Sequence, residues 1–360
     1  MKKSLFNQYK KFLPITHKTP EVTLGEGFTP LVKSRNLSNK FNCEMYFKLE
    51  GCNPSSSFKD RGMFMAVSKA IENKKQKIIC ASTGNTSASA AAYGARYNLE
   101  TFVIIPAGKI ALGKLLQAMA YGAKIISING NFDQALKAVR EISDNLGLEI
   151  VNSINPYRLE GQMTGAFEIS DELDGAPDFQ FMPVGNAGNI SSYFKGYKKY
   201  MDAKKISKLP KLIGIQAENS APLVDNKIID SPSTLASAIR IGNPASSKLA
   251  KDAISVTGGK FIKVSDDEII NAQSILAKEE GLFCEPASAA SLAGFFKYAE
   301  SEDDYKGKTL TFILTGNGLK DPEVAKKYLS SKIIKTSSKI KDIAESIQNG
   351  KSKSFIRRFF

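Results

Sequence analysis

Short apolar runs that alternate with helical patterns are the feature that most constrains the fold of this chain. Four such runs occupy residues 78–81, 101–105, 124–128 and 149–152, and helical patterns separate them. Residues 87–96 and 114–120 are two of these helical patterns, and Gly122 is placed to end the second. Apolar runs separated by helices are typical of parallel strands that are covered on both faces. The first half of the chain therefore predicts a parallel α/β sheet.

A second series of apolar runs predicts a second sheet. The runs occupy residues 179–184, 211–216 and 310–314. In α/β folds, small-molecule sites lie beyond the carboxyl ends of the strands. Several polar motifs of this chain follow such runs directly, so we expect the functional site at these strand ends.

The composition limits the classes of protein to which the chain can belong. With 360 residues, of which 42% are apolar, it can bury one large or two ordinary cores. Its four cysteines form no C-x-x-C pair and it has one histidine, so we expect no zinc site and a reduced, cytoplasmic setting. No apolar stretch approaches about eighteen residues, so we expect neither a membrane span nor secretion. The net charge of +14 fits phosphate-bearing ligands, and equally a surface rich in lysine.

Lys59 is the candidate for the reactive residue. It follows a turn-rich polar segment, residues 53–58, and begins a helix that we expect to continue to about residue 70. Unpaired N–H groups of the helix and neighbouring Arg61 both disfavour another cation. They should lower the pKa of the amine and favour its neutral, nucleophilic form. The alternative is a solvated lysine at a helix start.

Two other segments are suited to binding anions. Residues 185–189 (GNAGN) follow a predicted strand and precede a helix over 190–200, where glycines and free N–H groups can hold a phosphate. Asn85 follows Ser82, Thr83 and Gly84 at another helix start, where it is either a helix cap or a ligand contact. Residues 108–114 (GKIALGK) nearly match a P-loop, but Leu115 stands where Mg²⁺ binding needs Ser or Thr, so we do not expect ATP binding.

Taken in order, several segments resemble motifs of the fold type II pyridoxal phosphate enzymes, and most closely those of the threonine synthase family. The lysine segment (SSSFKDRG, 55–62) is one of them. The others are residues 24–31, 47–50, 82–88, 106–115, 155–162, 183–190, 238–244, 285–290 and 314–322. Each segment alone is a weak signal, but their ordered spacing over nearly the whole chain makes a chance match implausible.

The resemblance implies an α/β fold of the tryptophan synthase β type, with two parallel-sheet domains and the site between them. Residues 1–55 and 154–335 would form a large cofactor-binding domain, and residues 56–153 a smaller inserted domain. Residues 336–360 would form a basic C-terminal tail. A homodimer is an expectation from the family alone.

The resemblance also implies a role for each candidate residue. Lys59 would bind pyridoxal phosphate covalently and act as the catalytic base, Asn85 would bond the ring hydroxyl of the cofactor, and Thr315 would meet its ring nitrogen. The cofactor phosphate would be bound by Gly185, Asn186, Ala187, Gly188 and Asn189. For the substrate carboxylate and phosphate we expect Ser82, Thr83, Thr86, Ser153 and Arg158. Thr315 is otherwise a strand-end residue, and Arg158 an arginine on the surface. The roles of Arg240 and Glu285 stay open, because Glu285 and Ser288 can equally cap a helix.

The implied activity is that of a carbon–oxygen lyase acting on phosphate, which converts O-phospho-L-homoserine and water to L-threonine and phosphate. Threonine dehydratase is the nearest alternative, because it shares the lysine and the phosphate loop but needs no site for a substrate phosphate. Residues 155–158 and 240–244 favour the synthase.

A noncatalytic alternative depends on the basic tail. Ile340, Ile343 and Ile347 have helical spacing, and residues 351–360 (KSKSFIRRFF) follow them. Such an end can contact anionic lipid or RNA, but it can equally be a solvated helix or a subunit contact. We expect no nucleic acid partner.

Overall fold

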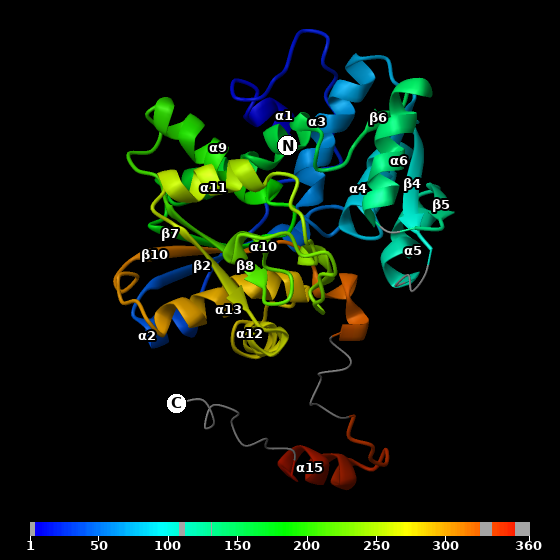
Figure 1. Ribbon diagram of the computed structural model, residues 1–360. Coiled ribbons are helices and arrows are strands. Elements are labelled where there is room, and N and C mark those ends of the chain that lie inside the picture. Colours follow the sequence, from blue (N-terminus) through cyan, green and yellow to red (C-terminus); the bar gives the residue numbers. More distant parts are fainter. Residues whose placement is uncertain (1–3, 108–111, 131, 325–332, 350–360) are drawn as a thin grey trace. The chain divides into compact units, whose positions relative to one another are not determined.

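Two compact units make up the chain, Met1–Pro322 and Glu323–Phe360 (Figure 1). The computed structural model describes residues 4–107, 112–130, 132–324 and 333–349. Residues 108–111 of the P-loop-like string and the basic end 351–360 lie outside these ranges. The domain boundaries given above stay a prediction.

A six-stranded sheet lies in the first unit, with strand order β1-β2-β10-β7-β8-β9. Its strands are β1 (Leu31–Lys33), β2 (Glu44–Leu49), β7 (Phe179–Pro183), β8 (Lys211–Ala217), β9 (Lys260–Val264) and β10 (Thr309–Leu314). β1 pairs antiparallel with β2, and all other pairs are parallel. The three predicted strands are confirmed as β7, β8 and β10, whereas β1, β2 and β9 were not predicted.

A second, fully parallel sheet has four strands in the order β5-β4-β3-β6. They are β3 (Lys77–Ala81), β4 (Glu100–Pro106), β5 (Lys124–Ile128) and β6 (Glu149–Ile150). All four predicted strands are confirmed, and β6 is shorter than expected. The α/β class and the two sheets are therefore as predicted.

Helices of the first unit connect the strands. They are α1 (Leu5–Gln8), α2 (Leu37–Phe41), α3 (Lys59–Glu72), α4 (Asn85–Arg96), α5 (Leu112–Ala120), α6 (Phe132–Asn145), α7 (Pro156–Gln162), α8 (Thr164–Glu172), α9 (Gly188–Asp202), α10 (Pro222–Asp225), α11 (Ser247–Val256), α12 (Asp266–Glu279) and α13 (Pro286–Ala299). Short 3-10 turns lie at η1 (Glu50–Cys52), η2 (Ser237–Ile239) and η3 (Gly318–Lys320). Figure 1 shows α9 and α11 on one side of the six-stranded sheet and α12 and α13 on the other.

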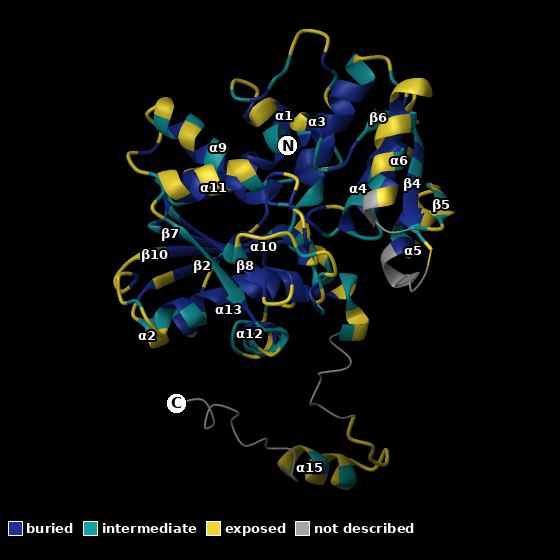
Figure 2. Ribbon diagram, in the orientation of Figure 1, coloured by how far each residue is buried: buried dark blue, intermediate teal, exposed yellow. Residues whose placement is uncertain are grey.

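The core of the larger sheet is aromatic. Phe181 and Phe312, on adjacent strands, stack at a centroid distance of 5.2 Å, and Phe295 of α13 meets the Phe312 ring edge-on at 5.5 Å. Such pairs add about 0.5–1.5 kcal/mol each to the hydrophobic burial. Figure 2 shows that the sheet and α13 are largely buried. This rigid layer carries the strand ends from which the site is built.

Two glycines bring α3 and α7 into backbone contact. A Cβ atom on Gly161 would lie 1.9 Å from the Arg61 carbonyl oxygen, and one on Gly62 would lie 2.4 Å from Arg158 Nε. A larger residue at either position would have to push the two helices apart. The contact places the start of α3, which carries Lys59, directly against the turn of α7 that carries Arg158.

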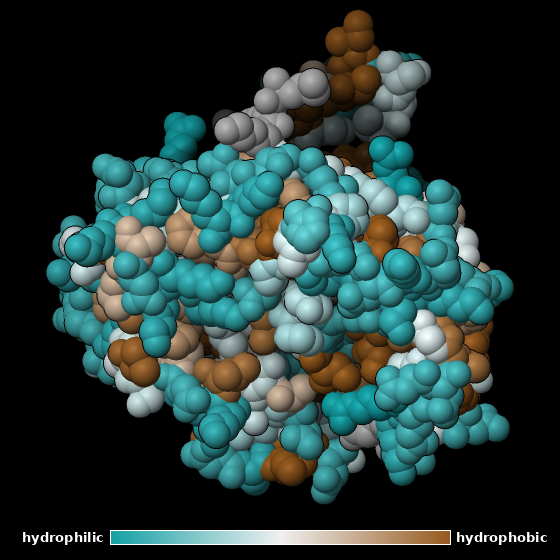
Figure 3. All heavy atoms as spheres, turned by 90° about the horizontal axis from the view of Figure 1, so that it is seen from above, coloured by the Kyte–Doolittle hydropathy of each residue, from teal (hydrophilic) through white to brown (hydrophobic). Residues whose placement is uncertain are grey.

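The second unit contains helix α15 (Ile340–Asn349). Ile340 and Ile347 are 86% and 71% exposed, so the predicted apolar stripe is present and open to solvent. In the described parts of the chain, every helix is too short or too polar to span a bilayer. On the first unit, Figure 3 shows a face on which hydrophilic side chains predominate and apolar ones are scattered.

Candidate active site

Lys59 is the first residue of α3, and the segment before it is fastened to the end of β10. The Phe58 N–H donates to the Thr315 carbonyl at 3.0 Å, and Ser57 forms an antiparallel bridge with Gly316. On the other side, Asp60 accepts bonds from the Ser55 N–H and hydroxyl, both at 2.6 Å. The backbone on both sides of Lys59 is therefore fixed, as expected for a residue at a strand-end site.

The amine of Lys59 is desolvated. Burial and, to a smaller extent, the charge of Arg158 lower its pKa to about 7, although the charge of Glu285 opposes the shift. The Nζ atom lies 4.2 Å from the centroid of the Phe58 ring. At pH 7 about half of such amines are neutral, against about one in three thousand for a solvated lysine. A pKa in this range suits a nucleophile or a general base.

Asn85 begins α4 at the end of β3, and its side chain points to the larger sheet. Its Nδ2 atom donates to both carboxylate oxygens of Glu285, each at 3.1 Å. The cap position of α4 is Gly84, so the interpretation of Asn85 as a helix cap is wrong. Asn85 is buried, and its contact links the start of α4 with the start of α13.

Thr315 follows β10 and is buried beside α13. Its Oγ1 lies 2.9 Å from Ser288 Oγ, which also accepts the Gly316 N–H at 2.9 Å. Ser288 therefore orients the Thr315 hydroxyl.

Residues 185–187 of the predicted loop join β7 to α9, and Gly188 and Asn189 begin the helix. Ala187 has φ +64° at the cap position of α9, so the loop turns sharply before the first helical N–H groups. Asn189, two residues after Ala187, is buried. Neither its Nδ2 atom nor its Oδ1 atom has a hydrogen-bond partner. A buried amide without partners costs about 1–3 kcal/mol, which a bound polar ligand removes. A loop of this kind at a helix N-terminus can bind an anionic group such as a phosphate.

Arg158 of α7 is fully buried, so its interpretation as a surface arginine is wrong. Its Nη1 donates to the Val151 carbonyl at 2.7 Å, whereas Nε has no partner. Burial lowers its pKa to about 10, and the guanidinium stays charged at neutral pH. A buried cation with an unused hydrogen-bond donor is suited to binding an anion.

The remaining candidates surround these residues at the strand ends of the smaller sheet. Ser82 and Thr83 follow β3, Thr86 is in the first turn of α4, and Ser153 lies between β6 and α7. All four are partly exposed. No hydrogen bond among the described residues joins Ser153 to Arg158, so their common role stays a prediction.

Glu285 and Ser288 are the site residues that the sequence left unassigned. Glu285 is at the cap position of α13, but its side chain makes no capping bond and contacts Asn85 instead. The capping interpretation is therefore wrong for the Glu285 side chain. The sequence signal for Glu285 was Pro286, because a proline holds the residue before it in extended backbone. That signal does not determine where the Glu285 carboxylate points.

Comparisons with known proteins identify the family of the chain. The family model described as "Pyridoxal-phosphate dependent enzyme" matches residues 22–316. The chain is 55% identical to threonine synthase of Halalkalibacterium halodurans, over 90% of this chain and 91% of that protein. It is 53% identical to threonine synthase of Bacillus sp. (strain ULM1), over 97% and 99%.

The fold itself is more widely shared. The structure of the processed form of threonine deaminase isoform 2 from Solanum lycopersicum superimposes with a TM-score of 0.71 at 24% identity, over 83% of this chain and 87% of that one. At this level of identity the likeness concerns the fold alone. The family match over residues 22–316, together with relatives that are more than half identical, places this chain in the family of pyridoxal-phosphate dependent enzymes.

Proposed function

We propose that this chain is a threonine synthase, which converts O-phospho-L-homoserine and water to L-threonine and phosphate. The proposal rests on the identity to threonine synthases over about nine tenths of the chain. The observation in the structure that supports it most is Lys59, whose pKa is lowered to about 7 beside the buried charge of Arg158. A reactive amine next to a buried cation suits a substrate that carries both an amino acid group and a phosphate.

The residues present fit pyridoxal phosphate, on which enzymes of this family depend. The loop 185–189 would hold its phosphate, with the unpartnered amide of Asn189 as one donor. Asn85 and Thr315 would contact the ring hydroxyl and the ring nitrogen, and Lys59 would hold the cofactor covalently. Pyridoxal phosphate, once bound, stabilises negative charge that develops on the substrate α carbon.

Lys59 would also move protons. When it is released from the cofactor, its neutral amine can accept the proton of the substrate α carbon, because desolvation keeps much of it unprotonated near pH 7. A β proton must then leave as the γ carbon loses phosphate. The γ carbon takes up a proton to become a methyl group, water adds its hydroxyl at the β carbon, and the α carbon regains a proton. A base whose pKa is close to the working pH can both take and return protons in such a sequence.

Arg158 is the proposed contact for the substrate phosphate. It keeps its charge in a buried position, and the Nε donor lacks a partner. Arginine matches phosphate with two parallel donors, and such a bond strengthens when water is excluded. Ser82, Thr83, Thr86 and Ser153 would supply further donors to the substrate phosphate and carboxylate.

A time course of both products tests the proposed function. Purified protein with pyridoxal phosphate is given O-phospho-L-homoserine, and phosphate and threonine are measured together. Equal amounts of both are expected. Phosphate without threonine would indicate a lyase that only eliminates. Deamination of threonine at a comparable rate would favour the threonine dehydratase alternative.

We also propose a cellular location and an oligomeric state for the protein. A cytoplasmic location fits a biosynthetic enzyme with four unpaired cysteines. A homodimer is proposed from the family, and light scattering of the purified protein would test it. The proposal includes no nucleic acid partner; retention of the protein on RNA at low salt would contradict this.

A further inference from the structure

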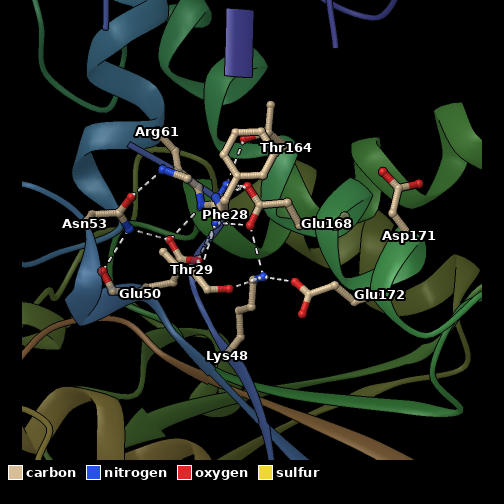
Figure 4. A network of polar contacts seen from close by, with 12 residues as sticks. Phe28, Thr29, Lys48, Glu50, Asn53, Arg61, Thr164, Glu168, Asp171 and Glu172 are labelled. Atoms are coloured by element: carbon tan, nitrogen blue, oxygen red, sulfur yellow. Dashed lines mark hydrogen bonds and ion pairs between the residues drawn. The ribbon is translucent and has the colours of Figure 1, made fainter. Parts of the chain in front are cut away.

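Arg61 lies two residues after Lys59 in the first turn of α3, and its guanidinium is fully buried between two carboxylates (Figure 4). Nε and Nη2 donate to Glu50 at 2.7 and 2.8 Å. Nη1 and Nη2 donate to Glu168 at 2.6 and 2.7 Å. One side chain thus makes paired bonds to two acids that belong to different elements, η1 and α8.

Lys48 of β2 extends this network. Its Nζ lies 2.9 Å from Glu168 and 2.7 Å from Glu172, and it donates to the Thr29 carbonyl at 2.7 Å. We call Lys48, Glu50, Arg61 and Glu168 the Arg61 cluster. It connects the larger sheet and α8 with the first turn of α3.

The Arg61 cluster consists of charges that are shielded from water. Its four side chains are at most 2% exposed, and two positive groups balance two negative ones. Burial raises the pKa of Glu168, but Arg61 and Lys48 bring it down to about 2, so this carboxylate is ionised. Apolar residues often give equal or greater stability in place of buried ion pairs. Stability alone is therefore a weak reason for such a cluster.

The geometry around Lys59 gives a stronger reason for the buried charges of the Arg61 cluster. Asp60, the next residue of the same turn, is held by the Ser55 hydroxyl and by the Ser89 hydroxyl, which donates to it at 2.5 Å. The Arg61 cluster holds the residue after it. Because both residues that follow Lys59 are fixed by buried polar contacts, the first turn of α3 has one orientation, and the Lys59 side chain starts from a fixed origin.

We propose that Arg61 is a positioning residue for Lys59, and that its paired bonds to Glu50 and Glu168 fix the direction in which the Lys59 amine is presented. The proposal rests on the role of Lys59 in the proposed function. Without these bonds, the first turn of α3 can rotate and the amine can leave its desolvated position between Arg158, Glu285 and the Phe58 ring. The amine would then behave as an ordinary lysine.

The test measures Lys59 directly in full-length protein from which the cofactor has been removed. Reductive methylation with formaldehyde and cyanoborohydride is followed by mass spectrometry of the peptide that carries Lys59, as a function of pH. Only the neutral amine reacts, so the pH of half-maximal rate reports its pKa. In the unaltered protein we expect this midpoint near pH 7.

Three variants separate positioning from stability. Arg61→Met removes the paired bonds, and Arg61→Lys keeps the charge without the paired geometry. The triple variant Glu50→Gln, Arg61→Met and Glu168→Gln removes the charges of Arg61 and its two acids, and it leaves Lys48 paired with Glu172. It keeps oxygen acceptors at position 50 for the Asn53 amide and at position 168 for the Phe28 N–H. Lys69→Met, near the far end of α3, is the matched control, because it breaks the pair with Glu72 on the same helix.

In each Arg61 variant we expect the midpoint to rise by about one pH unit or more, and the rate at pH 7 to fall by about tenfold or more. The triple variant should recover much of the unfolding midpoint lost in Arg61→Met, but not the reactivity of Lys59. Lys69→Met should keep the rate within about twofold. If Arg61→Met does not fold, the triple variant and Arg61→Lys decide between a positioning role and a stabilising role for Arg61.

An unchanged pH midpoint in a folded Arg61 variant would overturn the proposal, as would joint recovery of stability and Lys59 reactivity in the triple variant. Arg61 would then serve the stability of the fold only. The readout needs neither substrate nor turnover. A protein that makes no threonine but loses Lys59 reactivity in the variants would therefore contradict the proposed function and still support the positioning role.

Discussion

Both carboxylate oxygens of Glu285 lie 3.1 Å from the Nδ2 atom of Asn85, although the two residues belong to the helices of different sheets. The contact requires that Gly316 has no side chain. A Cβ atom there would lie 2.6 Å from Cδ and Oε1 of Glu285. The end of β10 thus leaves space for the acid that bonds Asn85.

Gly316→Ala should therefore displace Glu285 and disturb the site. We expect kcat to fall about tenfold or more, with a loss of about 1–3 kcal/mol in the free energy of unfolding from overpacking. The double variant Glu285→Ala with Gly316→Ala is the control, because the clashing carboxylate is absent. It should be no less active than Glu285→Ala alone. Additive losses would show that Gly316 acts by another route.

Lys59→Met should abolish turnover, because it removes the amine that we propose to hold the cofactor and to move the proton. It should also change how stability depends on pH. The folded pKa is about 7 and the unfolded value about 10.5, so between these values the unfolded chain binds a proton that the folded chain lacks. The unaltered protein therefore gains stability from pH 7 to 10.5, and the variant lacks this contribution.

Urea unfolding of both cofactor-free proteins at a series of pH values would measure this difference. Parallel stability curves over that interval would contradict the lowered pKa of Lys59. Remaining turnover in Lys59→Met would contradict its catalytic role.

Arg158→Met should impair substrate binding far more than cofactor binding. We expect KM for O-phospho-L-homoserine to rise about tenfold or more, since the proposed charge-assisted contact with the substrate phosphate is lost. Cofactor affinity, measured by absorbance titration, should stay within about threefold. Arg96→Met, which removes an exposed arginine of α4, is the control and should change neither value. Equal losses of substrate and cofactor affinity would contradict the assignment of Arg158 to the substrate phosphate.

Asn189→Leu should change stability and cofactor binding in opposite directions. The amide is buried without a partner, so its replacement by an apolar group of similar size should raise the unfolding free energy of the cofactor-free protein by about 1 kcal/mol. Affinity for pyridoxal phosphate should fall about tenfold, because a donor in the phosphate loop is lost.

The matched control for this prediction is Asn152→Leu. Asn152 is also buried, but its amide accepts from the Ala81 N–H and donates to the Ala81 carbonyl, both at 2.9 Å. Its replacement should cost about 1–3 kcal/mol. If Asn189→Leu destabilises the protein as much as this control does, the Asn189 amide has a partner.

The apolar strands of both sheets could be predicted because each is a continuous hydrophobic run. β2 and β9 could not, since Lys48 interrupts the apolar run of β2 and Lys263 interrupts that of β9. Lys48 is nevertheless fully buried, because Glu168 and Glu172 compensate its charge from a distant part of the chain. Local patterns cannot reveal a partner more than one hundred residues away.

The site was predictable to the extent that it follows strand ends. Lys59, Asn85, the loop 185–189 and Thr315 each come directly after a recognisable strand or turn, and α/β topology brings such positions together. The direction of a side chain was not predictable. Glu285 reads as a helix cap, and Arg61 was considered only as a charge beside Lys59; only the tertiary contacts show which acids or amides these side chains bond.

The backbone contact at Gly62 and Gly161 bears on which substrates can fit. Lys59 precedes Gly62 by one turn of α3, and Arg158 precedes Gly161 by one turn of α7. The spacing of the two helix backbones from which these side chains start is therefore set by direct contact, and side-chain repacking cannot change it. For a substrate with its amino group near Lys59 and its phosphate near Arg158, selectivity for chain length follows from the closeness of these helices.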